Sequence, residues 1–215
     1  MDARTKKLVT FAMMAALSYV AMVFIRIPVV MFLKYEPKDV IITIAGFLFG
    51  PVSSLIISLV VGLVEMVTVS DTGPIGLIMN VISSCAFCCT AAYIYKKRHT
   101  LQGAVTGLLA GTLFMTAIML LWNYFITPIY MGYPREAVAA MLIPVFLPFN
   151  LVKAALNAGI TMLLYKPVVG LLRRSGFVEG SSSAGKTQRN FGIIAGSVFV
   201  IATAIVAILV LSGKI

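Results

Sequence analysis

The chain has 215 residues, 60% of them hydrophobic and 11% charged, and its mean hydropathy is +1.04. Soluble domains contain roughly 25% charged residues, so this composition excludes most soluble folds and indicates a membrane protein. A membrane crossing needs about 20 apolar residues, which leaves no room for a sizeable soluble catalytic domain.

The net charge of +10 does not indicate a nucleic-acid partner, because the basic residues stand in small clusters beside apolar runs. Clustered Lys and Arg next to apolar segments are typical of cytoplasmic loops. With a cytoplasmic N-terminus, eleven of the seventeen Lys and Arg lie inside: Arg4, Lys6, Lys7, Lys96, Lys97, Arg98, Lys166, Arg173, Arg174, Lys186 and Arg189. The sequence therefore predicts a multi-pass protein of the bacterial cell membrane with its N-terminus in the cytoplasm. The first apolar run has no small-residue cleavage site after it, which argues against a removable signal peptide.

Seven apolar segments follow one another along the chain, at 8–26, 39–49, 52–69, 75–95, 101–126, 145–172 and 191–212. The second is too short to cross alone, and Gly50-Pro51 separates it from the third, so we expect these two to form a close hairpin. The predicted fold is an all-α integral membrane bundle of six transmembrane helices in residues 1–174, followed by a polar linker at 175–190. An additional transmembrane helix at 191–215 then stands as an appendage to the six-helix core.

Three connections fall on the predicted outer side, at 31–39, 68–74 and 127–144. Long ordered loops are often functional, so we expect them to cap a pocket. Small residues form two stripes, one at Ala12 and Ala16 in the first segment and one of glycines at 103, 107 and 111. Such stripes let helices approach closely, either within this bundle or against a partner subunit.

The segment Gly180–Thr187 fits the phosphate-loop pattern G-x-x-x-x-G-K-[ST]. That loop needs a buried strand before it and a separate acidic residue for magnesium, and neither is present in the sequence. We interpret the segment as part of a serine-rich linker.

Polar residues inside apolar segments are the candidates for chemistry. Asn80, Asn123 and Asn150 offer amide donors and acceptors, and Lys153 shares a helix face with Asn150. Lys153 either pairs with Glu65 or Asp71 as structural glue or meets a ligand in the pocket. Aromatic residues nearby are candidate walls for a flat ring: Trp122, Tyr124, Phe125, Phe146 and Phe149.

The sequence shows no set of residues for enzymatic chemistry. His99 is the single histidine and lies in a basic loop, and the three cysteines, Cys85, Cys88 and Cys89, share one apolar run without a histidine nearby. We interpret the cysteines as small packing residues and expect no catalytic residue, no bound metal and no cofactor.

The segments AGFLFGP (45–51), NYFITPIYMG (123–132) and IPVFLPFNLVKAALN (143–157), with A-x-x-x-A in the first helix, resemble the S components of energy-coupling factor (ECF) vitamin transporters. The resemblance covers about residues 5–173 and is strongest to the riboflavin-specific members. It implies a non-enzymatic subunit that binds a vitamin on the outer side and delivers it inward with a T component and two ATPase subunits.

The resemblance also implies roles for individual residues. Asn123, Asn150 and Lys153 match the flavin-contacting positions, Asn80 matches less closely, Tyr35 is the candidate in the capping loop, and Ala12 and Ala16 match the surface for the partner subunits. Riboflavin or flavin mononucleotide (FMN) is then the transported ligand. Another vitamin (folate, pantothenate or a thiamine precursor), a stand-alone secondary transporter and a membrane assembly protein remain as alternatives.

Overall fold

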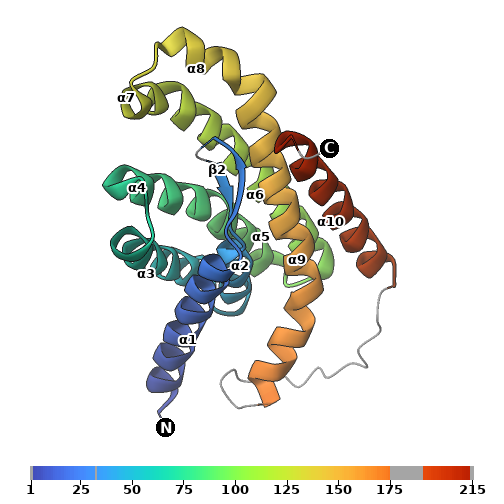
Figure 1. The fold of residues 1–215 in the computed structure, drawn as a ribbon. Helices are drawn as coiled ribbons and strands as arrows, with labels where there is room; N and C mark the ends of the chain where they lie inside the picture. Colours follow the sequence, from blue (N-terminus) through green and yellow to red (C-terminus); the bar gives the residue numbers. More distant parts are fainter. Residues whose placement is uncertain (1, 32, 175–190, 214–215) are drawn as a thin grey trace.

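The protein is a bundle of helices with one small β-hairpin at its centre (Figure 1). The computed structural model describes residues 2–31, 33–174 and 191–213. Within these residues, six helical stretches are long and apolar enough to cross a membrane: Arg4–Phe24, Pro51–Thr68, Gly73–Arg98, Leu101–Phe125, Arg135–Leu171 and Ile194–Leu211. The fold class expected from the sequence is confirmed. The linker at 175–190, with the Gly180–Thr187 segment, lies outside the described residues.

The first half of the chain surrounds one short helix, α2 (Lys38–Phe49), nine of whose twelve residues are buried. It is followed by α3 (Pro51–Thr68) and flanked by α1 (Ala3–Phe24). Gly50 has φ +93° between α2 and α3, a conformation that favours glycine, and Pro51 begins α3. The Ser54 hydroxyl donates to the carbonyl of Ile42 at 3.2 Å, across the two helices. The predicted close hairpin is confirmed.

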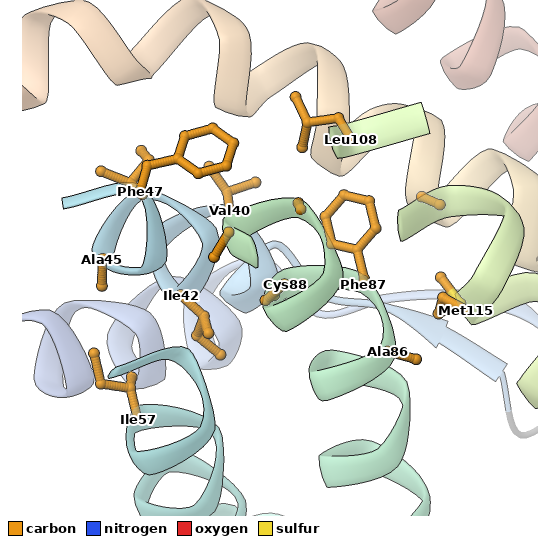
Figure 2. Close-up of a cluster of buried hydrophobic side chains, with 14 of the residues drawn as sticks. Val40, Ile42, Ala45, Phe47, Ile57, Ala86, Phe87, Cys88, Leu108 and Met115 are labelled. Carbon is orange, nitrogen blue, oxygen red and sulfur yellow. The ribbon is translucent and has the colours of Figure 1, made fainter. Parts of the chain in front are cut away.

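The main core gathers around α2 (Figure 2). Val40, Ile42 and Phe47 of α2 share this core with Ile57 of α3 and with Phe87 of the segment Gly73–Arg98. The segment Gly73–Arg98 contains α4 (Gly73–Ser84), a π-helical turn (Cys85–Cys89) and α5 (Thr90–Arg98). Cys88 is fully buried in this core and all three cysteines are free, so their predicted packing role is confirmed for Cys88.

Close packing of the π-helical turn and α5 on α6 (Leu101–Phe125) depends on glycines. A Cβ atom added at Gly107 would lie 2.7 Å from the carbonyl oxygen of Ala91, and one at Gly111 would lie 2.6 Å from that of Phe87. Both distances are shorter than any ordinary contact. The glycine stripe of this helix therefore packs inside the bundle.

Two predicted loops contain regular structure. Residues 127–144 form α7 (Thr127–Met131), α8 (Arg135–Met141) and the start of a π-helical turn (Leu142–Phe146) that continues into α9 (Leu147–Arg174). The first connection contains the antiparallel strands β1 (Ile27–Val30) and β2 (Leu33–Tyr35), which pair Ile27 with Tyr35; we call residues 27–31 and 33–35 the cap hairpin.

The last helix, α10 (Phe191–Leu211), lies along α9 (Figure 1). A Cβ atom at Gly159 would lie 2.9 Å from the Ile201 side chain, so the two helices are in close contact. α10 also contacts β1. It is thus packed on the flank of the bundle and touches the cap hairpin, which differs from the appendage that its polar linker suggested.

Candidate functional site

A cavity of about 290 Å³ opens beside the cap hairpin, between α3, α4, α6 and α9. Its lining brings together the three connections predicted to lie on one side of the membrane with polar residues of the helices. The described lining residues are Arg26, Met31, Leu33, Lys34, Glu36, Glu65, Asp71, Thr72, Met79, Asn80, Ser83, Met119, Asn123, Tyr130, Phe149, Asn150 and Lys153.

Four of the five predicted substrate-binding residues line this cavity: Asn80, Asn123, Asn150 and Lys153. The Asn150 amide donates to the carbonyl of Phe146 at 2.7 Å, and the Asn123 amide donates to that of Met119, also at 2.7 Å. Thr127 donates to the Asn123 oxygen at 2.9 Å, and Asn80 donates to Glu65 at 2.8 Å. These bonds fix the orientation of each amide and leave further hydrogen-bonding capacity toward the cavity.

Tyr35, the fifth predicted residue, is not brought to the cavity wall. Its side chain is buried and its hydroxyl donates to the Asn157 oxygen at 3.1 Å. Asn157 donates in turn to Asp39 at 3.3 Å, and Ser84 donates to the same carboxylate at 2.5 Å. Burial, with the nearby Asp39 charge, raises the pKa of Tyr35 well above its ordinary value. Tyr35 therefore links the cap hairpin to α9 through a buried polar network.

Buried ion pairs stand next to the cavity. Lys38 is 2% exposed and pairs with Glu65 and, at 3.0 Å, with Glu36, which also accepts from Arg26 at 3.0 Å. Burial acts to raise the pKa of Glu36, but the charges of Lys38, Lys153 and Arg26 outweigh it and lower that pKa. The sequence did not reveal this network, because Arg26, Glu36 and Lys38 stand in or beside a predicted loop, where charged residues are usually exposed to solvent.

Lys153 takes no part in these pairs. Glu65 is occupied by Lys38 and Asp71 by Lys34, and among the residues that the structure describes Lys153 forms no ion pair within 4 Å. Its side chain nevertheless lies in the cavity wall and the residue is 8% exposed. The arrangement favours the second interpretation of Lys153, in which its ammonium group faces a ligand.

Two polar contacts tie the cap hairpin to the loop between α3 and α4. Arg26 donates to the carbonyl of Val69 at 2.6 Å, and Lys34 pairs with Asp71. The Lys34 hydrogen bond, with the Lys34 charge, holds the pKa of Asp71 below its ordinary value. Arg26 is a lining residue that the sequence did not single out, and Asp71, considered there as a partner of Lys153, pairs with Lys34 instead.

The apolar wall differs from the aromatic one that the sequence suggested. Phe149 lines the cavity with Leu33, Met79 and Met119. Phe146 is fully buried behind it, and Trp122 lies in a smaller adjoining cavity that shares Thr72, Met79 and Tyr130 with the main one. The described lining has room for a flat apolar ring bounded by Phe149 and methionines.

Ala12 and Ala16 are exposed on the face of α1 that points away from the bundle. The opposite face carries buried Thr10, Met14 and Ser18 and packs on α2 and α3. Within the described residues there is no group of three or more His, Cys, Asp or Glu side chains placed to hold a metal.

Comparisons with known proteins identify the family of the chain. A family described as "ECF transporter, substrate-specific component" matches residues 6–165. The chain belongs to this family. S components are non-enzymatic, multi-pass membrane subunits of bacterial ECF transporters that work with a T component and ATPases.

Several named relatives cover most of the chain. Riboflavin transporter RibU of Staphylococcus aureus (strain TCH60) is 30% identical, over 80% of this chain and 94% of its own length. Riboflavin transporter FmnP of Bacillus subtilis (strain 168) is 26% identical, over 75% and 91%. A solved structure, "Structure and mechanism of the S component of a bacterial ECF transporter", superposes with a TM-score of 0.69 at 30% identity, covering 80% of this chain and 99% of that one.

Proposed function

We propose that this S component binds riboflavin in the cavity beside the cap hairpin. The observation that carries the proposal is the convergence of Asn80, Asn123, Asn150 and Lys153 on one cavity with an apolar wall. The names of the relatives support the same ligand.

The chemistry of the ligand suits these groups. A flavin has an apolar ring system, an imide edge with one N–H between two carbonyls, and a polyhydroxyl tail. Asn150 uses one amide N–H on Phe146, so its oxygen is free to accept the imide N–H. The Lys153 ammonium can donate to a ring carbonyl, and the Asn80 oxygen can accept from a hydroxyl of the tail. The ring would lie against Phe149.

Charge favours riboflavin over FMN. Arg26, Lys34 and Lys153 in the lining face the carboxylates of Glu36, Glu65 and Asp71. Behind the lining, Lys38 and Asp39 add one charge of each sign. Because the positive and negative side chains of the site are equal in number before a ligand binds, a phosphate group would add uncompensated negative charge.

For transport, we propose the arrangement implied by the family. The cavity faces outward, the N-terminus is cytoplasmic, and the exposed face of α1 around Ala12 and Ala16 meets the T component, which assembles with two ATPase subunits. Lys96, whose side chain lies beside Gly50 at the α2–α3 turn, belongs to a predicted inner loop, and none of the described cavity residues comes from that turn. Residues 1–174 form the binding unit, joined through 175–190 to the additional helix of 191–215.

A titration of the purified full-length chain tests the ligand. The single tryptophan, Trp122, adjoins the cavity, so bound flavin should quench the tryptophan emission. The fluorescence of the flavin itself should also fall on binding. We expect saturable quenching with riboflavin, weaker binding of FMN, and none with folate, pantothenate or a thiamine precursor. Failure to quench at micromolar riboflavin would overturn the proposal. Uptake by vesicles holding this chain alone, driven by an ion gradient, would indicate a secondary transporter instead.

A pair of variants locates the site. Asn150→Ala removes the proposed imide acceptor and should weaken riboflavin binding while the protein still inserts and purifies. Gln102→Ala, at an exposed amide of α6 away from the cavity, serves as the control. Equal affinities for the two variants would place the ligand elsewhere.

A further inference from the structure

The additional helix α10 shares an apolar cluster with the cap hairpin. We call the following residues the cap cluster: Val29 and Leu33 of the hairpin, Phe146 at the end of the π-helical turn, Phe149 in the first turn of α9, and Ala204 and Ile208 of α10. Leu33 and Phe149 also line the binding cavity. The cluster therefore links α10, through shared apolar packing, to two residues of the cavity wall, although α10 lies beyond residues 6–165, the part that the family matches.

The orientation of α10 is well defined by its contacts. Ala204 is 4% exposed and Ile208 is 8% exposed, whereas Ile205, on the outward face of the same helix, is 48% exposed. The close approach of Ile201 to Gly159 fixes how α10 lies along α9. At its C-terminal end, α10 reaches the top of α9 near the cap hairpin (Figure 1).

The cap hairpin needs such support. A two-stranded hairpin alone is only marginally stable, and this one has strands of four and three residues. One side of it is held by polar contacts, through Arg26 to Val69 and Lys34 to Asp71. Val29 and Leu33, on the apolar side of the hairpin, are buried in the cap cluster. Ala204 and Ile208 are the α10 members of that cluster.

We propose that α10 holds the cap hairpin closed over the cavity, with Ala204 and Ile208 as positioning residues that slow the escape of bound ligand. Burial of apolar surface between α10 and β1 favours the closed arrangement, and loss of that contact leaves the hairpin with its polar contacts alone. The ligand part of this proposal rests on the proposed riboflavin function; the closure itself does not.

The test compares two identical substitutions on one helix. Ile208→Ala truncates a cap-cluster residue, and Ile205→Ala makes the same change on the outward face. We expect Ile208→Ala to speed riboflavin dissociation several-fold with an equal or faster association rate, and Ile205→Ala to match the unmodified chain. A general loss of folded protein would lower the amount of binding without this separation of the two rates.

A second readout needs no vitamin. Met119→Cys places a thiol in the cavity wall of a chain in which Cys85, Cys88 and Cys89 are alanine, and a small charged thiol reagent measures how often the cavity opens. Ile208→Ala should raise the labelling rate several-fold and Ile205→Ala should not. Equal labelling and equal dissociation rates in the two variants would overturn the proposal. If riboflavin does not bind at all, the labelling still decides the role of α10.

Val29→Ala truncates the hairpin side of the same contact and carries the test if Ile208→Ala does not purify as a folded protein. Where both single variants purify, the double variant should be less affected than the sum of the two single ones, because both truncate side chains of the cap cluster. Fully additive effects would show that Val29 and Ile208 act separately, against the proposal.

Discussion

Lys153 is an unusual residue because it is a nearly buried cation without an ionic partner among the described side chains. The carboxylates of the cavity lining, Glu36, Glu65 and Asp71, are each paired with another cation. Burying such a charge unpaired costs free energy unless a ligand or water solvates it. An unpaired ammonium group in a cavity wall is therefore expected of a residue that binds a ligand.

Replacing Lys153 should therefore separate binding from stability. In Lys153→Met, which keeps the length and removes the charge, we expect riboflavin affinity to fall about 10-fold to 100-fold, the worth of one hydrogen bond to a charged group. The melting temperature of the unliganded protein should stay equal or rise. Fluorescence titration and thermal unfolding in detergent measure the two effects. Lys97→Met, distant from the cavity lining, is the control, and an unchanged affinity in Lys153→Met would remove Lys153 from the site.

The lowered pKa of Glu36 predicts acid sensitivity. Since the folded protein favours the ionised carboxylate, Glu36 stabilises the fold above its unfolded pKa of about 4.3. That contribution is lost as the pH falls through the lowered folded value. From pH 8 to pH 5, Glu36 should cause little change in the melting temperature. Below about pH 4 the melting temperature of the unmodified protein should fall, and it should fall less steeply in Glu36→Gln. Parallel falls in both proteins would contradict this role.

Individual site residues could be predicted to the extent that they interrupt apolar sequence. Asn123, Asn150 and Lys153 stand out because a polar group in hydrocarbon is costly and needs a reason. Tyr35 could not be placed, since a tyrosine in a loop is equally compatible with a ligand contact and with its observed bond to Asn157. The pairing of Arg26 with Glu36 depends on the tertiary fold, which spacing does not reveal.

At the scale of elements, segment positions followed from hydropathy but the connections did not. Residues 127–144 contain Pro134 and Pro144, which suggested a loop. The chain instead places Pro134 before the first turn of α8 and accommodates Pro144, which lacks an N–H, in a π-helical turn. The cap hairpin escaped prediction because strands of four and three residues are too short to show an alternating pattern.

The packing of α6 on the π-helical turn Cys85–Cys89 gives a prediction for a single element. Gly111→Ala puts a methyl group against the carbonyl oxygen of Phe87, so one helix must shift, at a cost of about 1–3 kcal/mol. Gly196→Ala in α10 makes the same change with no neighbouring atom within 4 Å and should leave stability equal or higher. Thermal unfolding distinguishes them. A melting temperature for Gly111→Ala as high as that of Gly196→Ala would show that the helices separate freely.

At the scale of the whole molecule, the cavity, the flank of α9 and the exposed face of α1 are separate surfaces of the described chain. The cavity opens beside the cap hairpin, between α3, α4, α6 and α9, and α10 covers a flank of α9. The face of α1 around Ala12 and Ala16 stays uncovered within the described part of the chain. A small-residue surface on a membrane helix suits close contact with another helix, because small side chains let backbones approach.

Enlarging this surface should uncouple assembly from binding. In Ala12→Leu/Ala16→Leu, the added side chains would hold a partner helix away from α1, so we expect co-purification with the T component and ATPases to be lost. Riboflavin affinity should stay unchanged, because both residues are outside the cavity lining. Ala117→Leu, on an exposed face of α6, adds the same bulk elsewhere and should leave the complex intact. A complex that survives the double substitution but dissociates with Ala117→Leu would move the partner surface from α1 to α6.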